Sequence, residues 1–334
     1  MSSAQPGYFR RELLRWYDAH RRDLPWRRDC DPYRVWLSEI MLQQTRVAAV
    51  LDHYVRFLRR FPTVQSLAAA RESSVLTAWS GLGYYHRARR MHRAAKLIAR
   101  EGGRFPTTTG EWAELPGIGR YTAAAIASIC FGEPVAAVDG NVERVVDRVF
   151  GRAQGNKAVS ARAQQLLDPQ RPGDFNQAMM ELGATICTPR APQCMVCPVS
   201  AFCRTRGAQR PVPQAKRRSR RVFLALVRKN ASTLLVRRPM DASLMAGMWE
   251  LPEMPSARVN GALPLLRLRH SITITDYHVA VFAASPEQLQ DCAARGRWFT
   301  RRQYERLPLT GLTRKVLRRL PPAPREGPAE SICF

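Results

Sequence analysis

Four cysteines lie within seventeen residues of this chain, at Cys187, Cys194, Cys197 and Cys203, in the spacing C-x6-C-x2-C-x5-C. Thiolates are soft ligands that favour iron–sulfur clusters or zinc. Zinc frameworks usually carry two close C-x2-C pairs, and this segment has one. The spacing therefore favours a loop that folds around a [4Fe–4S] cluster, with zinc and with disulfides or free thiols as the alternatives.

The charge of the chain is the second strong signal. Fifty-three Lys and Arg residues face 27 Asp and Glu residues, which gives a net charge of +26. Such an excess is typical of proteins that bind a polyanion, so we expect a nucleic-acid partner. The alternative is a diffusely basic, solvated surface that has no such partner.

Composition and the N-terminus bear on location. Hydrophobic residues make up 45% of the chain, which is enough for well-formed cores. The start at Met1–Pro6 is short and polar, and no apolar run approaches the roughly 18 residues of a membrane span. We expect an intracellular, reducing location, namely the cytoplasm of a bacterium in association with the nucleoid.

Apolar periodicity divides the chain into two domains. Residues 8–205 show three- and four-residue spacing, which predicts helices at 9–19, 33–61, 75–80, 85–101, 121–131, 142–150, 158–167 and 174–185. Residues 209–221 hold six basic residues and two prolines and predict a linker. Beyond it, β-branched runs predict strands at 222–227, 233–236, 271–275 and 278–282, followed by helices at 301–304 and 313–320. Residues 321–334 are rich in proline and predict a disordered tail.

A glycine-containing turn joins two predicted helices at Leu115–Gly119. Gly117 and Gly119 let the backbone approach a phosphate closely, and the N-terminus of the following helix favours an anion. The segment at about 107–131 resembles a helix-hairpin-helix element, which grips the DNA backbone without reading sequence. The alternative is a simple connection between two helices.

Asp139 stands just before an apolar-periodic helix, in the run VDGNV at 138–142. One interpretation is a helix N-cap, a common role for aspartate. The other is a carboxylate aimed into a groove beside the hairpin, where it stabilises positive charge on a sugar. The residues alone leave these two interpretations level.

The order of hairpin, aspartate and cysteine loop resembles the endonuclease III superfamily of DNA glycosylases. Further motifs are similar to those of its MutY-type adenine DNA glycosylase family: LPWR at 24–27, WLSEIMLQQT at 36–45, GLGYY at 81–85 and LMAGMWELP at 244–252. The resemblance implies a mainly α helix-hairpin-helix glycosylase domain with an iron–sulfur loop at 187–203, followed by a smaller α+β Nudix-like domain. We expect these domains at 1–208 and 222–320.

Tyr121 stands where the endonuclease III branch carries a lysine that forms a Schiff base. A phenol cannot form an imine, so the resemblance implies a monofunctional glycosylase. It further implies that Glu39 is the general acid, that Asp139 stabilises the oxocarbenium-like sugar or attacks it, and that Tyr121 and Asn141 position Asp139 or the sugar. The matching positions for a base pocket are Trp26, Arg27, Leu42 and Glu181, and those for residues that enter the DNA helix are Gln44 and Tyr84.

The second domain lacks the G-x5-E-x7-R-E-x2-E-E-x-G run that holds Mg²⁺ in catalytic Nudix domains, so we expect no pyrophosphatase activity. The resemblance implies that it recognises 8-oxoguanine opposite the adenine. In the matching stretch at 270–278, Ile272 is the expected apolar wedge and Thr273 the expected hydroxyl. Ile274 replaces a histidine that is usual in the family, which bears on discrimination between 8-oxoguanine and guanine.

These features predict an enzyme of base excision repair that removes adenine mispaired with 8-oxoguanine or guanine in double-stranded DNA, acting as a monomer. Two alternatives remain. One is an endonuclease III-like or other mismatch glycosylase, against which Tyr121 argues. The other is a non-catalytic iron–sulfur DNA-binding protein, against which the presence of both Glu39 and Asp139 argues.

Overall fold

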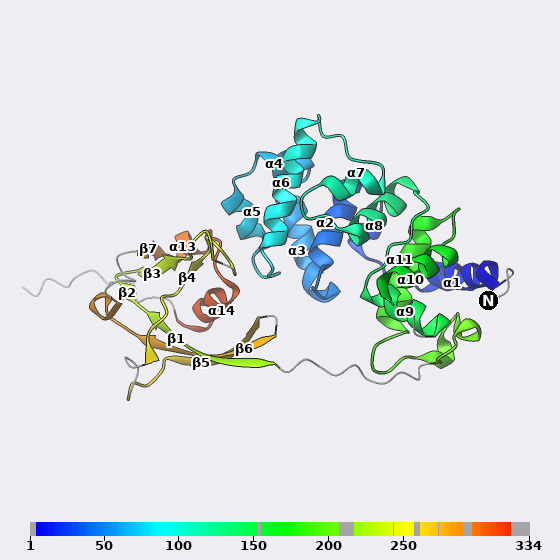
Figure 1. Ribbon diagram of the computed structural model, residues 1–334. Coiled ribbons are helices and arrows are strands. Elements are labelled where there is room, and N and C mark those ends of the chain that lie inside the picture. Colours follow the sequence, from blue (N-terminus) through cyan, green and yellow to red (C-terminus); the bar gives the residue numbers. More distant parts are fainter. Residues whose placement is uncertain are drawn as a thin grey trace, which may run out of the picture. The chain divides into compact units, whose positions relative to one another are not determined.

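The computed structural model describes residues 5–151, 155–206, 217–242, 244–256, 261–272, 274–289 and 296–321. The chain forms two compact units: Met1–Ala69 with Arg90–Pro213, and Ala70–Arg89 with Gln214–Phe334. The first unit is helical, and the sheets lie in the second (Figure 1). Residues 70–89, which the sequence pattern assigns to the helical domain, group with the C-terminal residues.

The described helices of the first unit include every predicted helical segment outside residues 70–89. They are α1 (Gln5–His20), α2 (Pro32–Leu42), α3 (Val47–Arg60), α4 (Val64–Ala69), α6 (His86–Arg100, whose first turn groups with the second unit), α7 (Thr109–Glu114), α8 (Arg120–Phe131), α9 (Gly140–Phe150), α10 (Gly155–Leu166) and α11 (Pro172–Thr185). The helix predicted at 33–61 is two helices, because the chain turns at Gln43–Arg46 and Gln44 has φ +55°. The short helix α4 was not predicted, and α7 is the first helix of the hairpin element predicted at about 107–131.

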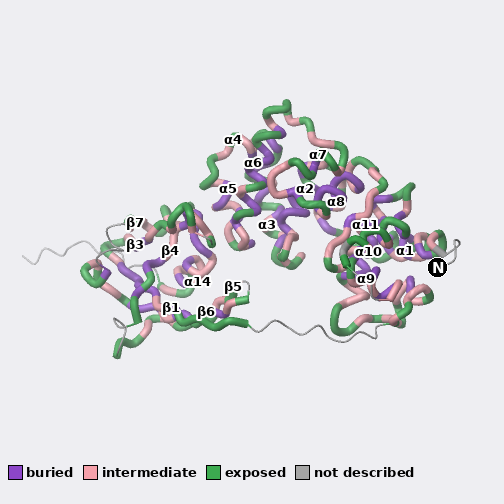
Figure 2. The backbone as a smooth tube through the Cα atoms, viewed as in Figure 1, coloured by how far each residue is buried: buried purple, intermediate pink, exposed green. Residues whose placement is uncertain are grey.

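Helix α8 runs through the middle of the first unit. Seven successive residues, from Thr122 to Ser128, are buried (Figure 2). Four of them are alanines, so neighbouring helices can approach its backbone closely on every side. A second core joins α1, α9 and α11 through Phe9, Tyr17, Val146, Phe175 and Leu182. Packing on α8 and in this core holds in place the ends of α2, α9 and α11, which carry the candidate site.

The second unit holds α5 (Glu72–Trp79) and two sheets. Strand β1 (Arg218–Leu226) runs parallel to β6 (Thr275–Ala283), which pairs antiparallel with β5 (Leu266–Ile272). Strand β3 (Ser232–Arg237) pairs with β2 (Arg228–Lys229), β4 (Trp249–Glu250) and β7 (Gly296–Thr300). The unit also contains the helices α13 (Arg301–Tyr304) and α14 (Gly311–Arg319).

Two predictions in this unit are corrected. The strand predicted at 271–275 is wrong, because β5 ends at Ile272, β6 begins at Thr275, and these two residues pair with each other. Residues 218–221, predicted as part of the linker, form the first half of β1 and pair with β6. Residues 209–216 of the predicted linker and residues 322–334 of the predicted tail lie outside the described residues.

Within the described part of the chain, no helix combines the length and the apolar character that crossing a bilayer requires.

Candidate functional site

The four predicted catalytic side chains line one pocket of the first unit. Glu39 comes from α2, Tyr121 from α8, Asp139 from the residue before α9, and Asn141 from the first turn of α9. The pocket has about 1600 Å³ of unfilled space, counting the part that is open to solvent. Residues that lie up to a hundred positions apart in the sequence therefore meet at one cavity.

Glu39 is a buried carboxyl group, with 7% of its surface exposed. Burial raises its pKa to about 7; the hydrogen bond with the Tyr121 hydroxyl lowers it, and the charge of Asp139 raises it further. Its Oε2 atom has no hydrogen-bond partner among the described residues. A substantial fraction of this side chain is therefore protonated near neutral pH, which is what a proton donor requires.

Asp139 is a helix N-cap, as one interpretation expected, and it also lines the cavity, whereas its action on a sugar stays a prediction. It is the N-cap of α9: Oδ1 accepts from the backbone N–H groups of Asn141 at 2.9 Å and Val142 at 2.8 Å. Its Oδ2 accepts from the side-chain amide of Asn141 at 2.9 Å, and the residue lines the same pocket as Glu39. The cap therefore fixes the orientation of a carboxylate that faces the cavity.

Four residues predicted for a base pocket, Trp26, Arg27, Leu42 and Glu181, line this cavity as well, together with Gln44. Glu181 accepts from Arg22 at 2.6 and 2.8 Å and from Arg27 at 2.9 Å. Burial raises the pKa of Glu181, but the hydrogen bonds and charges of the two arginines outweigh it and lower the pKa. Arg22 was not predicted, since a basic residue in an Arg-rich segment carries no distinguishing signal.

Arg144 is a second residue that the sequence did not reveal. Its Nη2 donates to Asn141 Oδ1 at 2.8 Å and to the carbonyl of Gly183 at 2.6 Å, and its Nε donates to the carbonyl of Cys187 at 2.8 Å. A Cβ atom on Gly183 would lie 2.6 Å from that of Asn141, so only glycine lets α11 approach this closely. Arg144 thus links the start of α9 to the end of α11 and to the cysteine loop.

The predicted hairpin is present between α7 and α8. Gly117 has φ +86°, and a Cβ atom there would lie 2.6 Å from that of Arg90, so both conformation and space require glycine. Gly119 is the N-cap of α8 in extended conformation, and no atom lies within 4 Å of the position of its Cβ. The open backbone at Gly119, in front of a helix N-terminus, suits a phosphate group.

In the second unit, Tyr84 lies in a turn held by neighbouring side chains. It has φ +46°, which is rare for a residue other than glycine. The buried guanidinium of Arg87 lies 5.4 Å from the centroids of both the Tyr84 and Trp79 rings, and it donates to the carbonyl of Leu82 at 3.2 Å. Ile272 is the last residue of β5, at the hairpin, whereas Thr273 lies outside the described residues.

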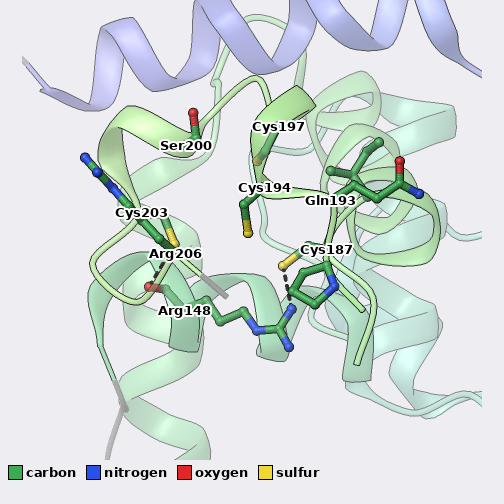
Figure 3. A pocket seen from close by; sticks show the side chains of 10 residues that line it. Arg148, Cys187, Gln193, Cys194, Cys197, Ser200, Cys203 and Arg206 are labelled. Atoms are coloured by element: carbon green, nitrogen blue, oxygen red, sulfur yellow. Dashed lines mark hydrogen bonds between the residues drawn. The ribbon is translucent and has the colours of Figure 1, made fainter. Parts of the chain in front are cut away.

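The four predicted metal ligands line one pocket, and none of them forms a disulfide (Figure 3). The described side chains that line this pocket with them include no carboxylate and no histidine. Among the described residues, no three His, Cys, Asp or Glu side chains converge as a single metal ion requires. Four thiols lining one pocket suit an iron–sulfur cluster, whose usual ligands are cysteine thiolates.

Arg148 on α9 contacts both ends of this cysteine loop and is almost fully buried. Its Nη1 donates to Cys187 Sγ at 3.2 Å and to the carbonyl of Thr188 at 2.9 Å (Figure 3). Its own carbonyl accepts from Cys203 Sγ and from the backbone N–H of Thr205, each at 3.3 Å. This residue was also missed, because a buried arginine cannot be told from an exposed one by sequence.

Comparisons with known proteins agree with this geometry. Residues 37–169 match the family model described as "HhH-GPD superfamily base excision DNA repair protein", and residues 187–203 match the "Iron-sulfur binding domain of endonuclease III". The human adenine DNA glycosylase is 36% identical over 403 residues, which cover 93% of this chain and 73% of the human protein. The cysteine loop is thus an iron–sulfur loop, as predicted.

Two solved structures share the helical fold. A thermostable thymine-DNA glycosylase is 31% identical with a TM-score of 0.56, and the match covers 60% of this chain and 95% of that one. Endonuclease III, in a trapped covalent intermediate with DNA, is 24% identical with a TM-score of 0.55, and the match covers 62% of this chain and 97% of that one. At this identity the likeness shows a shared fold and no more.

Proposed function

This chain belongs to the adenine DNA glycosylase family, and from that premise we propose that it hydrolyses the N-glycosidic bond of adenine mispaired with 8-oxoguanine or with guanine. It is a DNA glycosylase of base excision repair. The observation that carries the proposed chemistry is that Glu39 and Asp139 line one pocket in different settings. The first is buried and has a raised pKa, and the second is held by backbone N–H groups.

In the proposed reaction, Glu39 donates a proton to N7 of adenine, because the neutral base leaves far more readily than its anion. General acids of this kind contribute about 10²- to 10⁴-fold to the rate. As the base departs, the sugar becomes positively charged and Asp139 stabilises it. A charge pair at ~4 Å and an effective dielectric constant of ~20 is worth about 4 kcal/mol. Asn141 and Tyr121 position these two groups.

The adenine must leave the duplex to reach this cavity. Trp26 and Leu42 supply apolar contacts for the extruded base, and the Glu181 carboxylate, fixed by Arg22 and Arg27, supplies an acceptor. Gln44 and Tyr84, both with positive φ, are proposed to enter the helix where the base has left. Backbone strain at these two non-glycine residues supports a functional role, since such strain concentrates at functional sites.

A second candidate reaction is the lyase chemistry of an endonuclease III-like enzyme, which requires an amine. The partly buried phenol of Tyr121 occupies the position, and its pKa is raised well above its usual value by desolvation and by the charges of Glu39 and Asp139. We therefore expect strand scission only after alkali. Borohydride should trap no adduct with the wild-type protein, and efficient trapping would favour the lyase.

The second unit is proposed to be a Nudix-like domain that reads the base opposite the adenine. The apolar Ile272 at the end of β5 and the hydroxyl of Thr273 would meet 8-oxoguanine, whose N7–H is a donor where guanine has an acceptor. Because Ile274 offers no polar contact, we expect a smaller preference for 8-oxoguanine over guanine than a histidine would give, by roughly two- to tenfold for one hydrogen bond. Ile274→His should raise that preference.

The deciding experiment incubates the protein with duplexes that contain adenine opposite 8-oxoguanine, guanine, cytosine or thymine, followed by alkali. We expect cleavage at the first two pairs. Glu39→Gln and Asp139→Asn should bind the 8-oxoguanine duplex but fail to release adenine in a single turnover. Near-normal excision by either variant would refute the assigned roles, and gel filtration at working concentration tests the expected monomer.

A further inference from the structure

One face of the three-stranded sheet carries a group of basic side chains. The strand pairing sets Arg221 of β1 beside His278 of β6, and His278 beside Arg269 of β5 (Figure 1). In the next row on the same face, Arg267 lies beside Ala280. Since strands are about 4.8 Å apart, Arg221 and Arg269 emerge within about 10 Å of each other.

These side chains line an open groove with about 1210 Å³ of unfilled space. All three arginines and His278 are exposed. The ring of Phe223 also borders the groove, so its floor is partly apolar. The opposite face of the sheet is different: its side chains pack into a core with α14, through residues that include Val222, Leu268, Val279 and Val316. The groove is therefore on the face opposite this core, where Phe223, Ala280 and Phe282, which also line it, pack in a second, smaller core.

None of the described residues that line the groove is a carboxylate. Asp276 forms ion pairs with both Arg269 and Arg217, and Arg217 donates to its carboxylate at 2.8 Å. In the described part of the chain, neither Arg221 nor Arg267 lies within ion-pair distance of an acidic group. Arg221 on β1 and the two arginines on β5 are separated only by β6, so these like charges repel one another, and the described residues supply no counter-charge for two of the three. An external anion would relieve that repulsion.

We propose that this groove is a second DNA contact surface, which binds the phosphodiester backbone of the duplex through Arg221, Arg267 and Arg269. The occupant is DNA because the chain is a DNA glycosylase and because an open row of guanidinium groups complements a row of phosphates. Contacts of this kind position a duplex without reading its sequence. The inference rests on the proposed DNA substrate, and it assigns the sheet face a role separate from the hairpin at Ile272.

The test uses the full-length, cluster-containing protein and an undamaged duplex, with affinity measured across a series of salt concentrations. The double variant Arg221→Gln/Arg267→Gln is compared with Arg297→Gln/Arg302→Gln, which removes two exposed arginines of the same unit that lie outside the groove. Each phosphate contact contributes about 0.9 to the slope of log K against log salt. We expect the slope of the groove variant to fall by about 1.8 and its affinity on the order of tenfold, and the control slope to change by less than about 0.5.

Equal effects of the two double variants would overturn the inference, since the groove would then be only part of a diffuse positive surface. The inference would also be overturned if the groove variant lost affinity for a free nucleoside triphosphate while its slope of log K against log salt for the duplex stayed at the wild-type value. Single-turnover excision with saturating enzyme reports on the other proposal, because Glu39 and Asp139 lie in the first unit. A wild-type protein that binds duplex but releases no adenine would refute the proposed reaction and leave the salt test valid.

Discussion

Glu39 and Glu181 line the same pocket, and their pKa values are shifted in opposite directions. Both carboxyl groups are buried, so burial alone would raise both pKa values. The difference lies in their partners. Arg22 and Arg27 hold the Glu181 carboxylate, whereas Oε2 of Glu39 has no partner among the described residues. The cavity thus combines a proton donor with a fixed anion, an arrangement that assigns separate roles to two carboxyl groups.

The rate of adenine excision should fall as the pH rises through about 7, because the reaction needs the protonated form of Glu39 and its pKa is about 7. The measurement is the single-turnover rate on the 8-oxoguanine duplex from pH 5.5 to 9. Glu39→Gln should be roughly 10²- to 10⁴-fold slower, without this inflection. Glu181→Gln is the control: it should weaken substrate binding but keep the inflection. A wild-type rate that does not change between pH 6 and 9 would contradict the role of Glu39.

Glu39→Gln should also stabilise the protein at alkaline pH. The folded pKa of Glu39 lies above its unfolded value of 4.5, so folding favours the protonated form and loses stability as the pH rises from about 4.5 to about 7. An amide carries no charge and avoids this loss. We expect a gain on the order of 1–3 kcal/mol at pH 8 that disappears near pH 4.5, measured by denaturant unfolding. A difference that is independent of pH would mean that the Glu39 pKa is not raised.

Gly183→Ala should impair both stability and excision. The added methyl group would lie 2.6 Å from the Cβ of Asn141 and 3.0 Å from its carbonyl oxygen, so α11 and the start of α9 must separate. Overpacking of this kind costs about 1–3 kcal/mol. Because Asn141 holds Oδ2 of Asp139, we expect the single-turnover rate to fall as well. Gly110→Ala in α7 is the matched control: its methyl group meets only Thr108, at 4.0 Å, and it should be neutral or mildly stabilising.

Arg148→Gln should weaken the iron–sulfur loop. The variant loses the guanidinium that joins Cys187, Thr188 and the carbonyl of Pro189, and each lost bond in a buried site costs about 0.5–1.5 kcal/mol. We expect less iron and acid-labile sulfide per chain, and faster loss of the visible absorbance of the cluster on mild heating. Lys157→Gln, an exposed change on α10, should behave as wild type. Full iron content with unchanged heat resistance would show that Arg148 is not needed to hold the loop.

The helices and strands that were predicted correctly are those whose local sequence pattern has a single physical explanation. The spacing of apolar residues predicted α9 and α11. Gly117 indicated the turn of the hairpin, because glycine readily adopts a positive φ such as the +86° found there. The break at Gln43–Arg46 escaped prediction, since no glycine or proline stands there and Gln44 is held in its conformation by the surrounding fold. The end of β5 at Ile272 escaped for a similar reason: the run 271–275 is rich in residues that favour strands, but Ile272 pairs with Thr275 on the antiparallel strand β6.

The sequence by itself determined the identity of the reactive groups: four thiols at cluster spacing, a phenol in place of a lysine at Tyr121, and the presence of both Glu39 and Asp139. These are properties of single residues and short spacings, which do not depend on the rest of the chain. Only the tertiary structure decided which groups meet and what charge they carry. The raised pKa of Glu39, the lowered pKa of Glu181 and the contacts of Arg148 with both ends of the cysteine loop all depend on burial and on partners from distant segments. Desolvation and hydrogen bonding act through space, so no pattern along the chain contains them.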